Sequence, residues 1–187
     1  MPKNLIRCKS CGYVTEEGKV EDFCPACGVP AKMFEPYIDP VSEQRRNYLR
    51  LDIHPILVHF PQAFAFSLFL IAALSFAVTG PVKDAFISSI KVVTAFLPLV
   101  IILAFVSGLM DGKTRFRRVT TPFLKLKMMF GSSLFLISLG MAATVFKLDL
   151  SAPQSMVAFL VLSVCAVACS LPLGIIGSRL IEAKFPG

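Results

Sequence analysis

The sequence predicts an α-helical integral membrane protein, in which a four-helix transmembrane bundle follows a small N-terminal β domain that binds a metal. Its 187 residues are 55% hydrophobic and only 17% charged, whereas about a quarter of the residues in an average soluble domain are charged. Four long apolar runs follow residue 54, and four of the six cysteines lie before residue 28. Together these observations predict a membrane protein with a separate cysteine-based module.

Charge divides the chain at about residue 54. Residues 1–53 hold eight basic and eight acidic residues, so the whole formal net charge of +7 belongs to residues 54–187. We therefore expect a metal-binding domain at residues 1–37, a juxtamembrane linker with a short helix at 38–53, and a transmembrane domain at 54–187. The first residues contain no apolar stretch of the kind that a secretory signal needs, so the first span is expected to direct insertion itself.

Four runs are apolar and long enough to cross a bilayer, at about residues 56–78, 88–109, 126–146 and 156–177. A helix of about 20 apolar residues spans the roughly 30 Å of hydrocarbon. None of the runs shows the sustained apolar–polar alternation of a membrane β-strand. Four transmembrane helices are therefore expected, with the lipid bilayer as their surroundings.

Basic residues predict the orientation of these spans. Sixteen of the 19 lysines and arginines lie in the N-terminal segment, the connection between spans two and three, and the C-terminal segment, and only three lie in the other two connections. Basic residues accumulate on the cytoplasmic side of membrane proteins. The sequence therefore predicts a multi-pass protein of the inner or cytoplasmic membrane, with both termini in the cytoplasm.

Two C-x-x-C-G units carry the most specific chemical signal in the chain. Two cysteines three positions apart on a tight turn can direct both sulfurs to one metal, and two such turns make a tetrahedral tetrathiolate site. Paired disulfides and four free thiols are the alternatives, and a cytoplasmic location disfavours disulfides. The predicted metal ligands are Cys8, Cys11, Cys24 and Cys27.

Residues 5–37 resemble the short rubredoxin-like domain of rubrerythrins. The likeness rests on Cys-x-x-Cys-Gly-Tyr13, on Cys-Pro-x-Cys-Gly followed by Pro30, and on Phe34-Glu35. It implies a three-stranded β-ribbon that holds one iron on the four cysteines and cycles one electron, with Tyr13, Phe23 and Phe34 as an apolar cover. Zinc is the alternative ion, because zinc ribbons use the same ligands. The diiron helices of rubrerythrin are missing, so peroxidase activity is not expected.

The first span opens on His54-Pro-Ile-Leu-Val-His59-Phe-Pro. This motif resembles the HP-x-x-VHFP opening of a four-span family of predicted membrane proteins of unknown function, over residues 51–180. His54 and His59 are candidate ligands of a haem or a quinone. Five residues apart on one helix, they would point about 140° apart, so haem would need a methionine or a second chain. The favoured interpretation makes His54 an interfacial cap and gives His59 a hydrogen bond within the bundle.

The preferred function is a membrane-anchored electron carrier, in which the ribbon exchanges electrons with an unidentified cytoplasmic redox partner. The alternative is a structural zinc ribbon that serves as a docking or sensing module on a membrane scaffold. A channel is disfavoured because ionisable groups are missing near the middle of the spans. No catalytic constellation points to an enzyme, and the basic charge fits orientation rather than nucleic-acid binding. Small residues every four positions on two spans predict helix packing within one bundle, although a homo-oligomer stays open.

Overall fold

The structure is a computed structural model that describes residues 4–39 and 41–182, with side chains described as far as residue 180. It divides into two compact units, one within residues 1–44 and the other within residues 45–185. Lys3 and Lys184, two of the basic residues that predict orientation, lie outside the described residues. Each unit has its own architecture.

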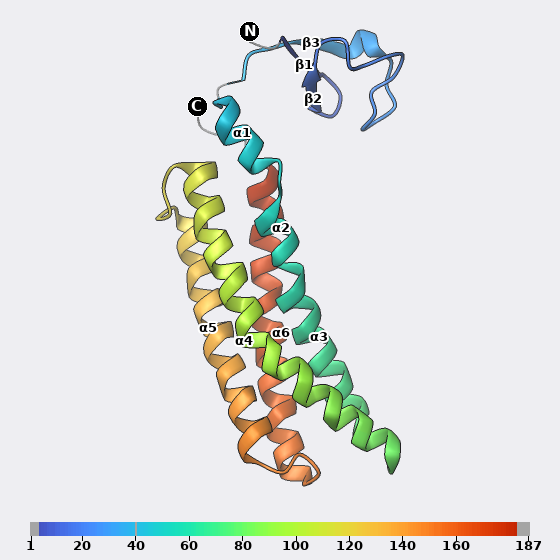
Figure 1. Ribbon diagram of the computed structural model, residues 1–187, viewed down its shortest axis with the longest axis vertical. Coiled ribbons are helices and arrows are strands. Elements are labelled where there is room, and N and C mark those ends of the chain that lie inside the picture. Colours follow the sequence, from blue (N-terminus) through green and yellow to red (C-terminus); the bar gives the residue numbers. More distant parts are fainter. Residues whose placement is uncertain (1–3, 40, 183–187) are drawn as a thin grey trace. The chain divides into compact units, whose positions relative to one another are not determined.

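The first unit is built on a three-stranded antiparallel sheet (Figure 1). Its strands are β1 (Leu5–Cys8), β2 (Val14–Glu16) and β3 (Phe34–Tyr37), in the order β2-β1-β3. A short 3-10 helix, η1 (Ala31–Met33), leads into β3. β3 contains Pro36, which an edge strand tolerates because one row of its backbone groups faces away from the sheet.

An ion pair between the central strand β1 and the edge strand β3 stabilises this sheet. Arg7 on β1 lies opposite Glu35 on β3, and their side chains form an ion pair of 2.6 Å. The Arg7 guanidinium also lies over the Tyr37 ring, 5.2 Å from its centroid. Its hydrogen bond and positive charge keep the pKa of the Glu35 carboxyl below its usual value. The ion pair therefore persists in mildly acidic solution.

Helices make up the second unit. Two short ones, α1 (Glu43–Leu49, which starts at the end of the first unit) and α2 (Ile53–Leu57), precede the long helix α3 (His59–Leu74). The other three long helices are α4 (Pro81–Phe116), α5 (Pro122–Lys147) and α6 (Pro153–Glu182). Each of these three begins at a proline, which suits the first helical turn because the N–H that proline lacks would have no partner there.

The four long helices form a ring in which each packs on two neighbours. α3 and α5 each contact both α4 and α6, and short connections make consecutive helices antiparallel (Figure 1). The buried core runs along the centre of this ring and includes Leu68, Leu97, Met141 and Phe159, one from each helix. The arrangement is an up-and-down four-helix bundle.

The outside of the bundle is apolar as well. Large exposed hydrophobic side chains occur on every long helix, among them Leu70, Phe96, Leu136 and Ile175, each more than half exposed. A soluble monomer rarely exposes so continuous an apolar surface. Four helical segments of the described chain are long and apolar enough to cross a membrane. These findings confirm the predicted fold class, a small metal-type β domain joined to a transmembrane-type helical bundle.

Three of the long helices, α4, α5 and α6, are longer than the apolar runs that predict them, whereas α3 ends at Leu74, four residues before the predicted end of its run. α4 has 36 residues, which corresponds to about 54 Å of helix against roughly 30 Å of hydrocarbon. Its charged ends, with Lys83 and Asp84 at one and Lys113 and Arg115 at the other, account for the excess. Apolar runs leave out the charged ends of a helix, so they underestimate the lengths of α4, α5 and α6.

Candidate metal centre

Two backbone turns of the same geometry carry the four cysteines of the first unit. In the first turn Cys8 N–H donates to the Tyr13 carbonyl and Gly12 N–H donates to the Cys8 carbonyl, at 2.8 and 2.9 Å. In the second turn Cys24 N–H donates to Val29 and Gly28 N–H donates to Cys24, at 2.7 and 2.8 Å. The repeated bonds make the two turns equivalent halves of one site.

Glycine is required in both turns because the backbone there is left-handed. Gly12 has φ of +78° and Gly28 has φ of +74°, values that a residue with a Cβ adopts only at a cost. The glycine after the second cysteine in each unit is thus explained by local geometry. It closes the turn so that both sulfurs of a unit lie on the same side.

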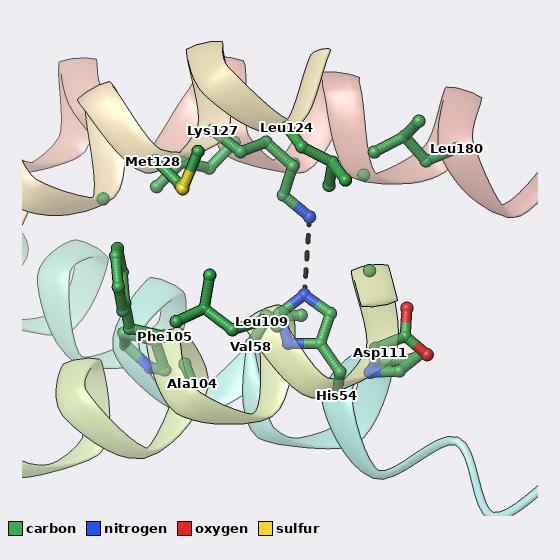
Figure 2. Close-up of a pocket in the computed structure, with 18 of the residues that line it drawn as sticks. His54, Val58, Ala104, Phe105, Leu109, Asp111, Leu124, Lys127, Met128 and Leu180 are labelled. Carbon is green, nitrogen blue, oxygen red and sulfur yellow. Dashed lines mark hydrogen bonds between the residues drawn. The ribbon is translucent and has the colours of Figure 1, made fainter. Parts of the chain in front are cut away.

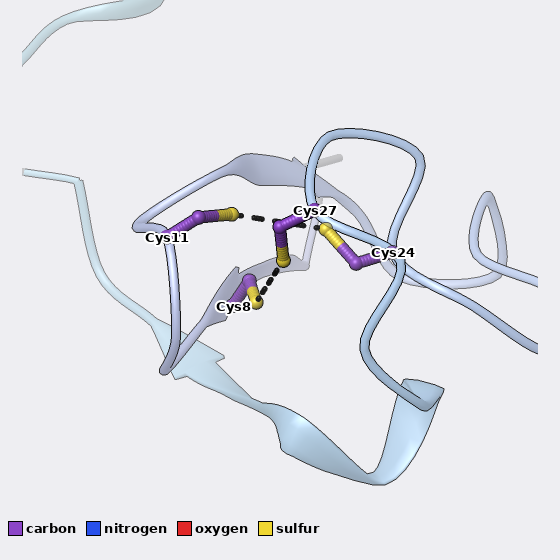
Figure 3. Close-up of side chains that lie close together, drawn as sticks. All are labelled: Cys8, Cys11, Cys24 and Cys27. Carbon is purple, nitrogen blue, oxygen red and sulfur yellow. Dashed lines mark hydrogen bonds between the residues drawn. The ribbon is translucent and has the colours of Figure 1, made fainter.

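The four sulfurs form a compact cluster that fits one metal ion (Figure 3). The Sγ atoms of Cys8 and Cys27 are 3.8 Å apart, as are those of Cys11 and Cys24, and all four lie within 4.8 Å of one another. A regular tetrahedron with metal–sulfur bonds of about 2.3 Å has edges of about 3.8 Å. The cluster therefore suits a tetrahedral thiolate site for iron or zinc.

Proton equilibria of the cysteines also favour a bound cation. Burial alone would raise the pKa of Cys24, but hydrogen bonds from the backbone N–H groups of Ala26 and Cys27 and from neighbouring thiols lower it to about 7. For Cys11, a hydrogen bond from the Tyr13 backbone lowers the pKa, yet desolvation and the neighbouring sulfurs together raise it to about 12. Four thiolates so close together repel one another, so complete deprotonation requires a metal ion between them.

Exposure divides the ligands into two pairs. Cys8 and Cys24, the first cysteine of each turn, are buried, whereas Cys11 and Cys27 are exposed. Among the expected cover residues, Phe34 is half-buried but Tyr13 and Phe23 are 39% and 62% exposed. Phe23 therefore covers little, and one side of the sulfur cluster is open to solvent.

The candidate histidines lie in the second unit, on α2 and α3, and have different surroundings. Figure 2 shows His54 facing Lys127. His54, on α2, is half-buried, with its Nδ1 atom 3.1 Å from Ser107 Oγ and its Nε2 atom 3.4 Å from Lys127 Nζ. His59, at the start of α3, is exposed, and its Nδ1 atom lies 2.6 Å from the carbonyl oxygen of Pro55. His54 thus bonds to side chains of α4 and α5, whereas the hydrogen bond of His59 is local, to a carbonyl of α2 four residues earlier.

Both histidines nevertheless line one cavity of the bundle, together with Met128. Their cofactor role stays a prediction, since binding of a haem or a quinone needs its own observation. Sequence reasoning missed Lys127 and Gln62, which also line this cavity. The available signal was the pair of lysines, Lys125 and Lys127, at the start of an apolar span, where a charged group is costly unless it has a role.

Comparison with known families supports the metal centre. Residues 7–35 match the family model described as the rubredoxin-like domain of rubrerythrin. No curated protein and no solved structure matches the chain. The resemblance of residues 51–180 to a four-span membrane family stays a prediction. The N-terminal unit is accordingly a rubredoxin-like metal-binding domain, and the match covers that part of the chain alone.

Proposed function

We infer that the protein is a membrane-anchored, rubredoxin-like electron carrier whose four cysteines hold one iron ion. The observation that most directly supports this function is the tetrahedral arrangement of the four sulfur atoms in a domain that matches the rubredoxin-like family. Bound iron supplies one-electron chemistry, cycling between its ferrous and ferric states. The chain contributes a rigid thiolate cage, and its hydrogen bonds from backbone N–H groups to sulfur favour the reduced, more negative site.

Electrons enter and leave this site through its exposed ligands. The sulfur atoms of Cys11 and Cys27 belong to exposed residues, whereas those of Cys8 and Cys24 are buried. A partner that docks on the open side approaches the metal through a single sulfur atom instead of through protein. The exposure of Phe23, at 62%, gives such a partner an apolar contact beside the site.

The bundle keeps this carrier at the membrane. Its short connections and the excess of basic residues near α1, between α4 and α5, and at the C-terminal end support a cytoplasmic location for the ribbon. About 16 residues, part of which form α1, connect the domain to the predicted first span, so the ribbon stays tethered to the bundle. The ribbon thus takes electrons from a cytoplasmic donor and passes them to an acceptor in or at the membrane.

Metal analysis and the visible spectrum of the purified full-length protein test this function. Aerobically purified protein should contain about one iron per chain and be red, and the thiolate-to-iron bands should disappear on reduction with dithionite. Cys8→Ser should abolish the colour. Cys165→Ser is the control, since this cysteine lies on α6 in the bundle and its loss should leave the spectrum unchanged.

A colourless protein that carries zinc, takes up no electrons and keeps its ribbon folded would contradict the proposal. That result would establish the alternative function, a structural ribbon that presents a docking surface on a membrane scaffold. In that case the Cys8→Ser variant would lose the ability to bind a partner, and neither it nor the parent protein would show redox activity.

A further inference from the structure

A cavity of about 310 Å³ lies inside the second unit, at the end of the bundle that carries α2 and the connection between α4 and α5 (Figure 2). Residues from α2, α3, α4, α5 and α6 line it, and most of its surface is apolar. We call it the end pocket. Its volume is at the lower end of the range for small-molecule sites, so it suits a ring-sized group with an apolar extension.

Glycines on two helices make room for polar side chains of the pocket. A Cβ atom at position 108 would lie 2.8 Å from His54 Cε1, and one at position 174 would lie 3.0 Å from Gln62 Nε2. The polar side chains of His54 and Gln62 thus lie against bare backbone of α4 and α6. Any larger residue at these positions would displace a polar group that lines the end pocket.

Lys127 brings a positive charge to this pocket. Its ammonium group has three N–H donors, and the one described partner is His54 Nε2 at 3.4 Å. Nearby, the Asp111 carboxylate already forms an ion pair with Arg115, with 3.2 Å between Oδ2 and Nε. Among the described residues no carboxylate forms an ion pair with Lys127, so two of its donors remain for another acceptor.

The hydrogen bonds around His54 determine which of its two ring nitrogens donates and which accepts. Ser107 Oγ donates to the Ala104 carbonyl at 2.9 Å, so its oxygen accepts from His54 Nδ1–H at 3.1 Å. The Nε2 atom of His54 is then the acceptor for Lys127. With both ring nitrogens engaged, His54 has none left for a haem iron. The end pocket therefore offers donors to an acceptor-bearing molecule, and it offers no free nitrogen of His54 to a metal.

Gln62 supplies a second donor to the same molecule. Its amide also lines the end pocket and forms no hydrogen bond with the described residues. The Gln62 amide nitrogen lies beside Gly174, and Lys127 Nζ lies 3.9 Å from a Cβ built at Gly177. These glycines are three residues apart on α6, about 4.5 Å along the helix axis, so both donors lie beside the same part of α6. Oxygen atoms of one small molecule can therefore accept hydrogen bonds from both.

We propose that the end pocket binds the head group of a lipid-soluble quinone, whose oxygen atoms accept hydrogen bonds from Lys127 and Gln62 and whose apolar tail lies in the lipid. The choice of a quinone over other acceptor-bearing lipids rests on the proposed electron-carrier function. An ammonium group also stabilises the negative charge that a ring oxygen gains when a one-electron carrier reduces it. Phe105, Leu109 and Met128 supply apolar walls for the ring.

Binding of decylubiquinone to the full-length protein in phosphatidylcholine nanodiscs tests this inference without any redox step. The expected result is saturable binding of one quinone per chain. Lys127→Met should weaken binding at least about tenfold, since it removes a charged donor, and Gly177→Leu should abolish it by filling the pocket. Lys125→Met is the matched control, because Lys125 is exposed two residues away on α5 and its loss should not change the affinity.

Thermal unfolding of each variant shows that it is folded before its affinity is compared. Absence of saturable binding, equal affinity of Lys127→Met and the parent, or saturable binding of oleate with no binding of decylubiquinone would overturn the proposal. Iron content and dithionite bleaching are measured on the same samples. A protein that bleaches but binds no quinone disproves the quinone site alone, whereas a zinc protein that binds quinone disproves the electron carrier alone.

Discussion

Buried hydroxyl groups of the bundle donate to backbone carbonyls of their own helices. Ser75, Ser138, Ser163 and Ser170 each bond a carbonyl three residues earlier, at 2.6–2.9 Å. Such bonds satisfy a hydroxyl where no water is available. Thr94 is the exception among the described residues, since its fully buried Oγ1 atom has no partner.

Removing this unpartnered hydroxyl should stabilise the bundle. Thr94→Val keeps the volume of the side chain and removes the desolvation cost, so we expect a gain of about 1–2 kcal/mol in the free energy of unfolding. Thermal unfolding in detergent measures the change. Thr144→Val is the control and should bring no gain, because the Thr144 hydroxyl already bonds the Gly140 carbonyl at 2.9 Å. A destabilised Thr94→Val variant would show that Oγ1 has a partner.

The left-handed glycines of the metal turns give a second prediction at the residue scale. Gly28 has φ of +74° and open space around its Cα atom, so Gly28→Ala tests backbone conformation without a clash. We expect it to destabilise the ribbon by about 1–2 kcal/mol, seen as metal loss to a chelator roughly 5–30 times faster. Gly28→Asn should lose metal more slowly than Gly28→Ala, because asparagine tolerates this conformation better. Equal rates for the two variants would refute the argument.

At the scale of elements, the end of α4 depends on an arginine from α1. The Nε and Nη2 atoms of Arg45 donate to the carbonyl oxygens of Thr114 and Arg115, at 2.5 and 2.6 Å. Carbonyl groups at a helix C-terminus have no partner within the helix and attract positive charge. Arg45 therefore caps α4 and holds the first helical segment of the second unit against it.

Loss of this cap should loosen both helices. In Arg45→Ala, the amides of residues 45–49 and of the last turn of α4 should exchange with deuterium at least about five times faster, equivalent to about 1 kcal/mol. Arg50→Ala is the control, since Arg50 is exposed just beyond α1. Hydrogen–deuterium exchange of the two variants in nanodiscs measures the difference. Unchanged exchange in Arg45→Ala would mean that packing alone holds α1.

Local patterns in the sequence predict the elements but not what they enclose. The spacing of Cys8, Cys11, Cys24 and Cys27 predicts the metal cluster because each turn is formed by residues next to one another in the chain. Apolar runs predict the four long helices for the same reason. From the sequence alone, Gly108 and Gly174 are interpreted as residues for helix packing. Their contacts with His54 and Gln62 exist only in the folded bundle. The end pocket depends on residues up to about 120 positions apart, which no local pattern connects.

At the scale of the whole molecule, the protein consists of two compact units that depend on different forces. Membrane-facing apolar surface and helix packing stabilise the bundle. The ribbon has too few residues for a large core, so a bound metal must supply much of its stability. Each unit should therefore keep or lose its structure independently of the other.

Metal removal tests this independence. Two of the three tyrosines, Tyr13 and Tyr37, lie in the ribbon, the third, Tyr48, lies on α1 in the second unit, and the chain has no tryptophan. A metal-dependent change in tyrosine fluorescence thus reports mainly on the ribbon, while far-ultraviolet circular dichroism is dominated by the helices of the bundle. A strong chelator in the presence of reductant should change the fluorescence and leave the helical signal intact. Loss of helical signal together with the metal would show that the two units fold as one.

The electron count of the metal centre tests the central claim most directly. Anaerobic titration of the purified full-length protein with dithionite, followed in the visible spectrum, gives the number of electrons taken up per chain. The account predicts one iron and one electron per chain, with the colour restored on reoxidation. A colourless chain that holds zinc on Cys8, Cys11, Cys24 and Cys27 and accepts no electron would contradict it.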